Sequence, residues 1–574
     1  MPNSELDKLQ ELLAVSRGDN QADLVLKNTN LINVFTGKIE SGAVAIHSGR
    51  IAGIGDYDGK QAIDLHGAFL SPGLIEGHIH IESSKLIPSR FAELVVPRGT
   101  TTVIADPHEI ANVLGIDGIR FMIRESLDLP IDIFFMLPSC VPATSMETSG
   151  ANLTATDLEP LLLEDRVIGI AELMNFPGAL FGDPNVLSKA LLTGGTKPID
   201  GHAPGLSGKK LDAYIASGPS TDHECNTLAE AKEKLALGMR IMIREGSTAK
   251  NMDSLIGVVD STTERRCLFV SDDRRPGDLL TEGHIDQILR LAVRKGLDPV
   301  TAIRMVSLNI AETFHLYDRG GIRPGWKADL VAFDNLIEFN ATHVWKDGTL
   351  VAKQGKYLPE KKFYAQSAIK PLLVPKLSHD ILQVKDSGGP IRVIGVIPDK
   401  IITEGRVLTL PSNCGNLLAD PVQDIAKLVV IERHSGSGRG AVAFVQGMGL
   451  REGAIGSTVV HDSHNIIVCG MDDDSIINAI EWLVEQGGGQ VAVNGNSILE
   501  ELPLPIAGLM SADSPEKVAN QEEKLIRSAH QLGSPLGDPF MALSFLALPV
   551  IPELKLTDFG LVDVNQFKHV PLFI

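Results

Sequence analysis

The chain of 574 residues is poor in cysteine and contains no long apolar run. Its five cysteines lie far apart and form no CxxC pair, which argues against a disulfide framework or a cysteine-based structural zinc module and fits a reducing cytoplasm. No uncharged stretch of about 18 apolar residues occurs, and the first residues, MPNSELDKLQELLAVSRG, have a helical pattern without an apolar signal core. We therefore expect neither membrane insertion nor export, and we predict a cytoplasmic protein.

Basic residues are also scarce, because 52 Lys and Arg stand against 72 Asp and Glu, for a formal net charge of −20. Nucleic acid and anionic membranes bind clustered Lys and Arg, so this balance disfavours both as partners. A small neutral or cationic substrate fits better. The length and the 44% hydrophobic content suit two to four domains.

From residue 70 onward, short apolar segments alternate with helical stretches, which is typical of an α/β fold. Eight such units over about 200 residues match the count and size of a (β/α)8 TIM-like barrel. A doubly wound open sheet is the alternative, because short buried strands look alike in both folds. The predicted strands are 70–80, 101–106, 132–140, 167–173, 198–202, 219–223, 240–245 and 267–272.

The segments on either side of this barrel predict one small β-domain. Short strands dominate before residue 70, and GWKADLVAF at 325–333 echoes ADLVL at 22–26, so the two segments are expected to pair in a split β-sandwich. A stretch rich in Pro and Lys then leads into a further domain without a nucleotide-binding fingerprint. The predicted domains are an N-terminal helix at 1–20, a β-domain of 21–69 plus 323–365, a metal-dependent hydrolase barrel at 70–322 and a C-terminal α+β domain at 390–574.

Polar residues close the apolar segments of the barrel, where barrel enzymes keep their active sites. The run LIEGHIHIE at 74–82 carries two histidines two residues apart. Side chains alternate between the faces of a strand, so His78 and His80 point the same way and form half of a metal site. The other polar residues at strand ends are Asp106, Glu172, His202, His223, Glu245 and Asp272.

Six of these residues form a candidate site for two divalent cations. A histidine taken singly is more often a hydrogen-bonded structural residue, but the ordered set predicts metal binding. A carboxylate such as Glu172 can bridge two cations, and a hydroxide held between them is nucleophilic at neutral pH because metals lower the pKa of bound water. The candidate ligands are His78, His80, Glu172, His202, His223 and Asp272.

Several of these segments resemble a known family. PGLIEGHIHIE resembles the amidohydrolase superfamily, and further segments are similar to adenine deaminases of the bacterial type over nearly the whole chain. The resemblance implies hydrolysis of adenine to hypoxanthine and ammonia in purine salvage and adenine catabolism, two divalent cations (manganese first, with iron or zinc as options), and a homo-oligomer, a dimer or larger. The similar segments are ADPHEIANV at 105–113, IAELMN at 170–175, DGHAPG at 200–205, TDHE at 221–224, SDDR at 271–274 and VQGMGLREGAIGSTVVHDSHN at 445–465.

The resemblance also implies roles in the reaction. Asp272 would bind a metal and accept the proton of the hydroxide that attacks C6, and Asp273 is its rival, although Asp272 directly follows the apolar run. Attack at C6 pushes electrons onto N1, so an acid near N1 stabilises the intermediate. Glu109 is the predicted acid, with a helix-capping carboxylate as the alternative. His108 would orient the hydroxide or support other groups.

Arg244 and Glu245 are expected to line the substrate pocket, with a buried ion pair as the alternative. Two other functions compete with deamination. One is cleavage of a cyclic amide, as in dihydropyrimidinase- or hydantoinase-like relatives, but many of these place a carboxylated lysine on strand four, where this chain has Glu172. The other is a non-enzymatic scaffold, which would be free to lose ligands, whereas this chain keeps all six. Zinc nucleoside deaminases are excluded by the missing CxxC.

Overall fold

The computed structural model describes residues 4–360, 371–398 and 400–574. Positions 1–3 of the predicted N-terminal helix and 361–365 of the predicted β-domain therefore lie outside the described residues. Helix α1 (Glu5–Ser16) begins at a capping box, in which the Ser4 side chain accepts from the Asp7 amide and the Asp7 carboxylate accepts from the Ser4 amide. Among the helices described, none combines the length and the apolar character needed to cross a bilayer.

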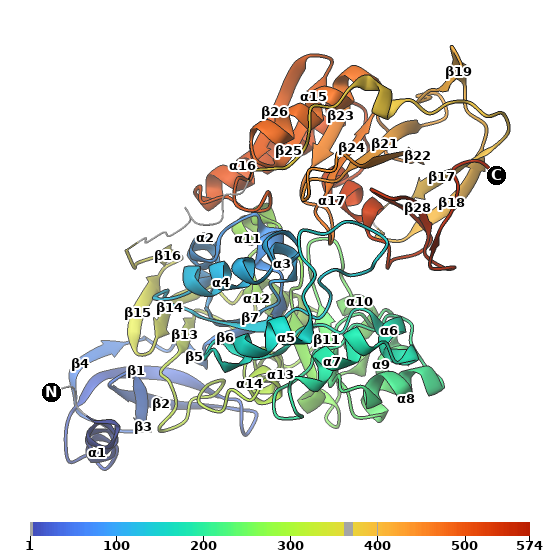
Figure 1. Ribbon diagram of the computed structural model, residues 1–574. Coiled ribbons are helices and arrows are strands. Elements are labelled where there is room, and N and C mark those ends of the chain that lie inside the picture. Colours follow the sequence, from blue (N-terminus) through green and yellow to red (C-terminus); the bar gives the residue numbers. More distant parts are fainter. Residues whose placement is uncertain (1–3, 361–370, 399) are drawn as a thin grey trace.

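The segments before and after the barrel share one nine-stranded sheet (Figure 1). β13 pairs antiparallel with β5, so that Leu330 lies opposite Pro72 and joins the two distant segments. The order is β16-β15-β14-β13-β5-β1-β2-β3, and β4 pairs with β1. The strands are β1 (Ala22–Asn33), β2 (Lys38–His47), β3 (Arg50–Ile54), β4 (Gly59–Asp64), β5 (Phe69–Pro72), β13 (Leu330–Phe333), β14 (Ala341–Lys346), β15 (Thr349–Lys353) and β16 (Lys356–Tyr357).

Parallel strands of the central barrel overlap seven of the eight predicted segments, although several are shorter than predicted, and β10 keeps only two residues of 219–223. The predicted strand 70–80 divides at Gly73, where a Cβ would clash with the Thr101 side chain, and only β6 belongs to the barrel. The predicted strand 198–202 is reduced to a single bridge between Ile170 and Ile199, because Pro198 lacks the N–H that a ladder needs. The barrel strands are β6 (Leu74–Ile79), β7 (Thr100–Ala105), β8 (Asp132–Leu137), β9 (Val167–Ile170), β10 (Thr221–Asp222), β11 (Arg240–Arg244) and β12 (Cys267–Val270).

The barrel interior is packed with apolar side chains, including Ile75, Ile104, Met136, Met242 and Leu268. A filled interior leaves the end at which the strands finish as the place for a binding site. Helices cover the outside of the strands. They are α2 (Pro88–Val95), α3 (His108–Leu114), α4 (Ile116–Glu125), α5 (Ala155–Leu158), α6 (Phe176–Phe181), α7 (Pro184–Leu191), α8 (Gly208–Ala216), α9 (Leu228–Ala236), α10 (Met252–Leu255), α11 (Pro276–Thr281), α12 (Ile285–Arg294), α13 (Pro299–Met305) and α14 (Leu308–Thr313).

The C-terminal part forms an eight-stranded sheet with helices and lies against the barrel (Figure 1). A buried ion pair between Lys85 and Glu522 and an ion pair between Arg275 and Asp538 join the two parts. The sheet, in order, is β18 (Thr403–Leu408), β17 (Ile391–Val396), β22 (Gly440–Gln446), β21 (Ile425–Ile431), β24 (Ile466–Gly470), β23 (Ala454–Ser457), β25 (Gly489–Asn494) and β26 (Ser497–Pro503). Its main helices are α15 (Asp473–Glu485), α16 (Pro515–Gln531) and α17 (Pro539–Ser544), and small sheets are formed by β19 (Ser412–Asn413) with β20 (Asn416–Leu417) and by β27 (Leu554–Thr557), β28 (Gly560–Asp563) and β29 (Lys568–His569).

Candidate metal centre and substrate cavity

The two histidines of β6 converge on the carboxylate at the end of β12. His78 Nε2 lies 3.5 Å and His80 Nε2 lies 3.2 Å from Asp272 Oδ1. All three side chains are buried, and Asp272 has a left-handed backbone, which Asp tolerates better than most residues. Asp273 points elsewhere, because its carboxylate accepts from the Ser83 hydroxyl. The structure therefore brings Asp272, rather than Asp273, to the histidine pair.

Glu172 lies between this group and two further histidines. Its Oε2 is 2.5 Å from His202 Nδ1 and 3.3 Å from His223 Nε2, while its Oε1 is 3.6 Å from His80 Nε2. The two oxygens thus face different imidazoles, which is the arrangement of a carboxylate that can serve two cations. The predicted ligands belong to several overlapping groups that could each hold a cation. Glu172 groups with His78 and His223 and also with His80, Asp106 and His108, while Asp272 groups with His78 and His80, and His202 groups with His223 and Glu224. The rings of His78 and His223 stack with centroids 4.0 Å apart.

The donor atoms fit cations. His78 Nε2, which faces Asp272 Oδ1, is buried and has no hydrogen-bond partner among the described residues. His78 donates from Nδ1 to Asp200 Oδ2 at 2.9 Å, an outer carboxylate of the kind that orients metal-binding histidines. Unpartnered buried nitrogens are costly unless a ligand satisfies them. The clusters therefore have the chemistry of a site for divalent metal.

The charges in the cluster support the same reading. Burial would raise the pKa of Glu172, but the imidazoles of His202 and His223 hold it well below its usual range. Burial would lower the pKa of His80, but the Asp272 carboxylate beside it raises this pKa to about 10. Without cations, protons on imidazoles balance the buried carboxylates. Bound cations would replace those protons, so we expect metal binding to release protons.

Arg244 forms a buried ion pair at the edge of the cavity, and its contact with substrate stays a prediction. Its guanidinium lies 2.8 Å from Asp272 Oδ2 and also pairs with Glu224, so it forms a buried ion pair, and it lines the cavity as well. Glu245 is not among the described residues that surround the cavity, because its Oε1 accepts from the Met252 amide at 2.9 Å. Its predicted contact with substrate is therefore not supported.

His108 and Glu109 stand at the start of α3, on the rim of the cavity. His108 donates from Nδ1 to Asp106 Oδ2 at 2.9 Å, so the strand-end Asp106 orients His108. Glu109 does not cap the helix. Its Oε1 lies 2.5 Å from His461 Nδ1, and its Oε2 binds His464 Nε2.

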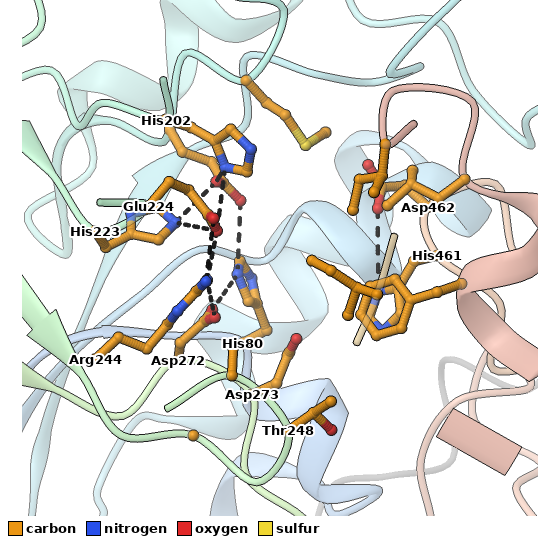
Figure 2. Close-up of a pocket in the computed structure, with 18 of the residues that line it drawn as sticks. His80, His202, His223, Glu224, Arg244, Thr248, Asp272, Asp273, His461 and Asp462 are labelled. Carbon is orange, nitrogen blue, oxygen red and sulfur yellow. Dashed lines mark hydrogen bonds and ion pairs between the residues drawn. The ribbon is translucent and has the colours of Figure 1, made fainter. Parts of the chain in front are cut away.

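Sequence reasoning missed two kinds of residue. Glu224 directly follows His223 in TDHE, and Asp200 lies two residues before His202 in DGHAPG, and this closeness to histidines was the available signal. His461 and Asp462 come from the C-terminal domain, where HDSH in VVHDSHN was noted only as part of a resemblance. Figure 2 shows His461 and Asp462 facing His202 and His223 across the cavity.

Known proteins match the chain along its length. The profile described as the amidohydrolase family matches residues 69–352, and the one described as the adenine deaminase C-terminal domain matches 400–568. An adenine deaminase from Desulfatibacillum aliphaticivorans is 48% identical over 98% of this chain and 99% of its own length. Adenine deaminase 2 from Carboxydothermus hydrogenoformans is 49% identical over the same shares. The chain belongs to the adenine deaminase family.

Membership of the adenine deaminase family confirms two predictions: the chain is a hydrolase that depends on metal, and its fold is the amidohydrolase barrel with an added C-terminal sheet domain. A crystal structure of beta-aspartyl dipeptidase from Fervidobacterium islandicum AW-1 aligns with 59% of this chain and 98% of its own, at 16% identity and a TM-score of 0.44. The family and the buried His, Asp and Glu clusters together indicate binding of divalent metal.

Proposed function

We propose that this protein hydrolyses adenine to hypoxanthine and ammonia, in purine salvage and adenine catabolism. The observation that carries the proposal is the group of four histidines and two carboxylates at the barrel mouth, all buried except the partly exposed His202, in a chain 44–49% identical to adenine deaminases over nearly its full length. The cytoplasmic location and the homo-oligomeric state stay predictions.

Two divalent cations, with manganese as the first choice and iron or zinc as options, would be held by six side chains. Bound there, they would lower the pKa of water so that it attacks near neutral pH. Glu172 is the proposed bridge, because its two oxygens face different histidines. The proposed ligands are His78, His80, Glu172, His202, His223 and Asp272.

Asp272 is also the proposed acceptor for the proton of the attacking water. The Arg244 guanidinium lies against its Oδ2, and burial notwithstanding, Arg244 and the neighbouring histidines hold the pKa of Asp272 well below its usual range. An ionised carboxylate at the attack site can take a proton and later return it to the departing amino group. Arg244 thus keeps this base charged.

The test uses the full chain loaded with Mn²⁺. Incubation with adenine should remove its ultraviolet absorbance and release ammonia in equal amounts, and elemental analysis should find two metals per chain. A protein that holds two metals but leaves adenine unchanged, while opening a dihydropyrimidine or hydantoin ring, would contradict the proposal and favour the cyclic amidohydrolase alternative.

A further inference from the structure

The loop between β23 and β24, residues 458–465, reaches from the C-terminal domain into the barrel mouth. Several bonds hold it in place. The buried Arg433 guanidinium donates to the His464 and Ala507 carbonyls, and Asn465 donates to the Thr148 carbonyl at 2.8 Å. The loop is therefore fixed against both the domain that carries it and the barrel that it enters.

Two histidines of this loop, His461 and His464, bind the carboxylate of Glu109 in the barrel. The Val460 amide donates to His464 Nδ1 at 3.1 Å, so the proton of that ring is on Nε2, from which it donates to Glu109 Oε2. Burial lowers the pKa of His464 to about 4, so this ring is neutral near pH 7. His461 Nδ1 lies 2.5 Å from Glu109 Oε1, and although burial opposes its charge, the Glu109 carboxylate raises the pKa of His461 to about 9.

The other nitrogen of His461, Nε2, is unpartnered within the part of the chain that the structure describes. His461 lines the cavity and is 4% exposed, and among the described residues its Nε2 has no hydrogen-bond partner. The ring stacks on Phe545 with centroids 4.7 Å apart and planes 16° apart, and the His461 amide donates to the Ser544 hydroxyl at 3.2 Å. A ring fixed by stacking and by Glu109 thus keeps Nε2 free for a ligand, and Figure 2 shows His461 at the cavity.

We propose that His461 donates the proton that N1 of the purine needs, and that Glu109 positions and charges this donor rather than donating itself. This role rests on the proposed function, because it assumes that the ring in the cavity is adenine. It makes the C-terminal domain a direct contributor to the chemistry. The assignment also differs from the sequence prediction, in which Glu109 was the acid.

The proton balance closes. When the oxygen of water bonds to C6, one water proton passes to Asp272, the C6–N1 π pair moves to N1, and N1 takes the proton from His461 Nε2. The amino nitrogen then takes the proton from Asp272, and the C6–N bond breaks as ammonia leaves. The remaining hydroxyl becomes the C6 carbonyl, and its proton restores the His461 imidazolium.

Neighbouring groups are weaker candidates for the donor. Burial would raise the pKa of Glu109, but His461, His464 and His108 hold it well below its usual range, so it carries no proton to give. Asp462 lines the same cavity, and burial raises its pKa to about 6, so it is mostly ionised at neutral pH. Both carboxylates are thus wholly or mostly ionised at neutral pH. His461, in contrast, is charged, has a fixed orientation and carries a free N–H.

The test removes the imidazole of His461 by substitution and then supplies imidazole from solution. His461→Ala in the Mn-loaded full chain should keep both metals and lose on the order of 10²- to 10⁴-fold in kcat/KM for adenine. Added imidazoles should restore turnover, with a rate that follows the pKa of the added imidazole. His530→Gln is the matched control, because His530 lies on α16 of the same domain and binds the Leu536 carbonyl away from the cavity.

A purely structural role for His461 would give no rescue that depends on pKa. His461→Gln is the second variant if the alanine variant is unstable, and it should lower kcat far more than it raises KM. Because Glu109 acts through His461, Glu109→Gln should cost little more once His461 is gone.

Parent-level turnover in a folded, metal-loaded His461→Ala or His461→Gln variant would overturn the proposal. So would multiplicative losses in the double variant, or an inactive Asp462→Asn beside an active His461→Ala. Turnover of adenine by the parent tests the proposed function, and the ratio of variant to parent tests the role of His461, so the two can fail separately.

Discussion

Asp200→Asn should weaken metal binding through the tautomer of His78. Asp200 Oδ2 accepts from His78 Nδ1 at 2.9 Å, while Oδ1 accepts from the Gly201 amide at 2.8 Å and from the Thr221 hydroxyl. An asparagine that keeps its oxygen toward Gly201 and Thr221 turns its NH2 group to His78. Nδ1 must then accept, which moves the ring proton to Nε2, the nitrogen that faces Asp272. If the amide is flipped, its oxygen accepts from His78 Nδ1, but its NH2 group then faces the Gly201 N–H, so that two donors meet.

Either arrangement costs affinity. Loss of an outer partner of a metal-binding histidine typically lowers affinity about 10- to 100-fold, which corresponds to about 1.4 to 2.7 kcal/mol. The change should appear as a higher Mn²⁺ concentration for half-maximal occupancy when metal-free protein is titrated, with little change in the thermal midpoint of that metal-free protein.

Asp183→Asn is the matched control. Asp183 caps α7 and accepts from the Asn185 amide, and Asn caps a helix as well as Asp does. Its Mn²⁺ titration should match the parent. If Asp200→Asn also matches the parent, then Asp200 does not orient His78 for a cation, and the assignment of His78 Nε2 as a donor loses its main support.

Five further substitutions test the proposed set of ligands. His78→Ala or His80→Ala should lower bound metal and abolish deamination while circular dichroism stays close to the parent, because both residues lie at the barrel mouth and not in its packed layers; full occupancy with near-normal turnover would contradict this. Glu172→Gln keeps the volume but removes the charge that offsets two cations, so elemental analysis should find at least one ion lost, and two retained ions would refute the bridge. Asp272→Asn should be nearly inactive and retain metal poorly, whereas Asp273→Asn should keep its metals; the reverse pattern would exchange their roles.

Much of the barrel could be predicted from the sequence because local rules control it. Strand side chains alternate, so two histidines two residues apart had to share a face, and the ends of parallel strands had to meet at one end of the barrel. His78, His80, Glu172, His202, His223 and Asp272 accordingly come together. The prediction of a fifth strand at 198–202 was wrong, also for a local reason, because Pro198 has no N–H and only the bridge at Ile199 remains.

Side-chain partners were harder to predict than positions. Whether Arg244 met a substrate or a carboxylate depended on Glu224, which stands 20 residues away along the chain. Glu245 is adjacent to Arg244, yet it bonds the Met252 amide outside the cavity, as alternation along a strand requires for neighbours. The alternation that located the histidines therefore also excluded Glu245, but only once Arg244 was known to face inward.

The C-terminal contribution could not be predicted, because no local rule joins residues 352 positions apart, the separation of Glu109 from His461. The loop nevertheless contained a physical signal. Two histidines and an aspartate within four residues, followed at once by the apolar strand β24, place polar groups where burial is expected, and buried polar groups need partners. Glu109, at the start of α3, is a buried carboxylate at the barrel mouth, and such a group also needs partners. Each group supplies a hydrogen-bond partner for the other, so under the proposed role of His461 the barrel and the C-terminal domain both contribute to one active site.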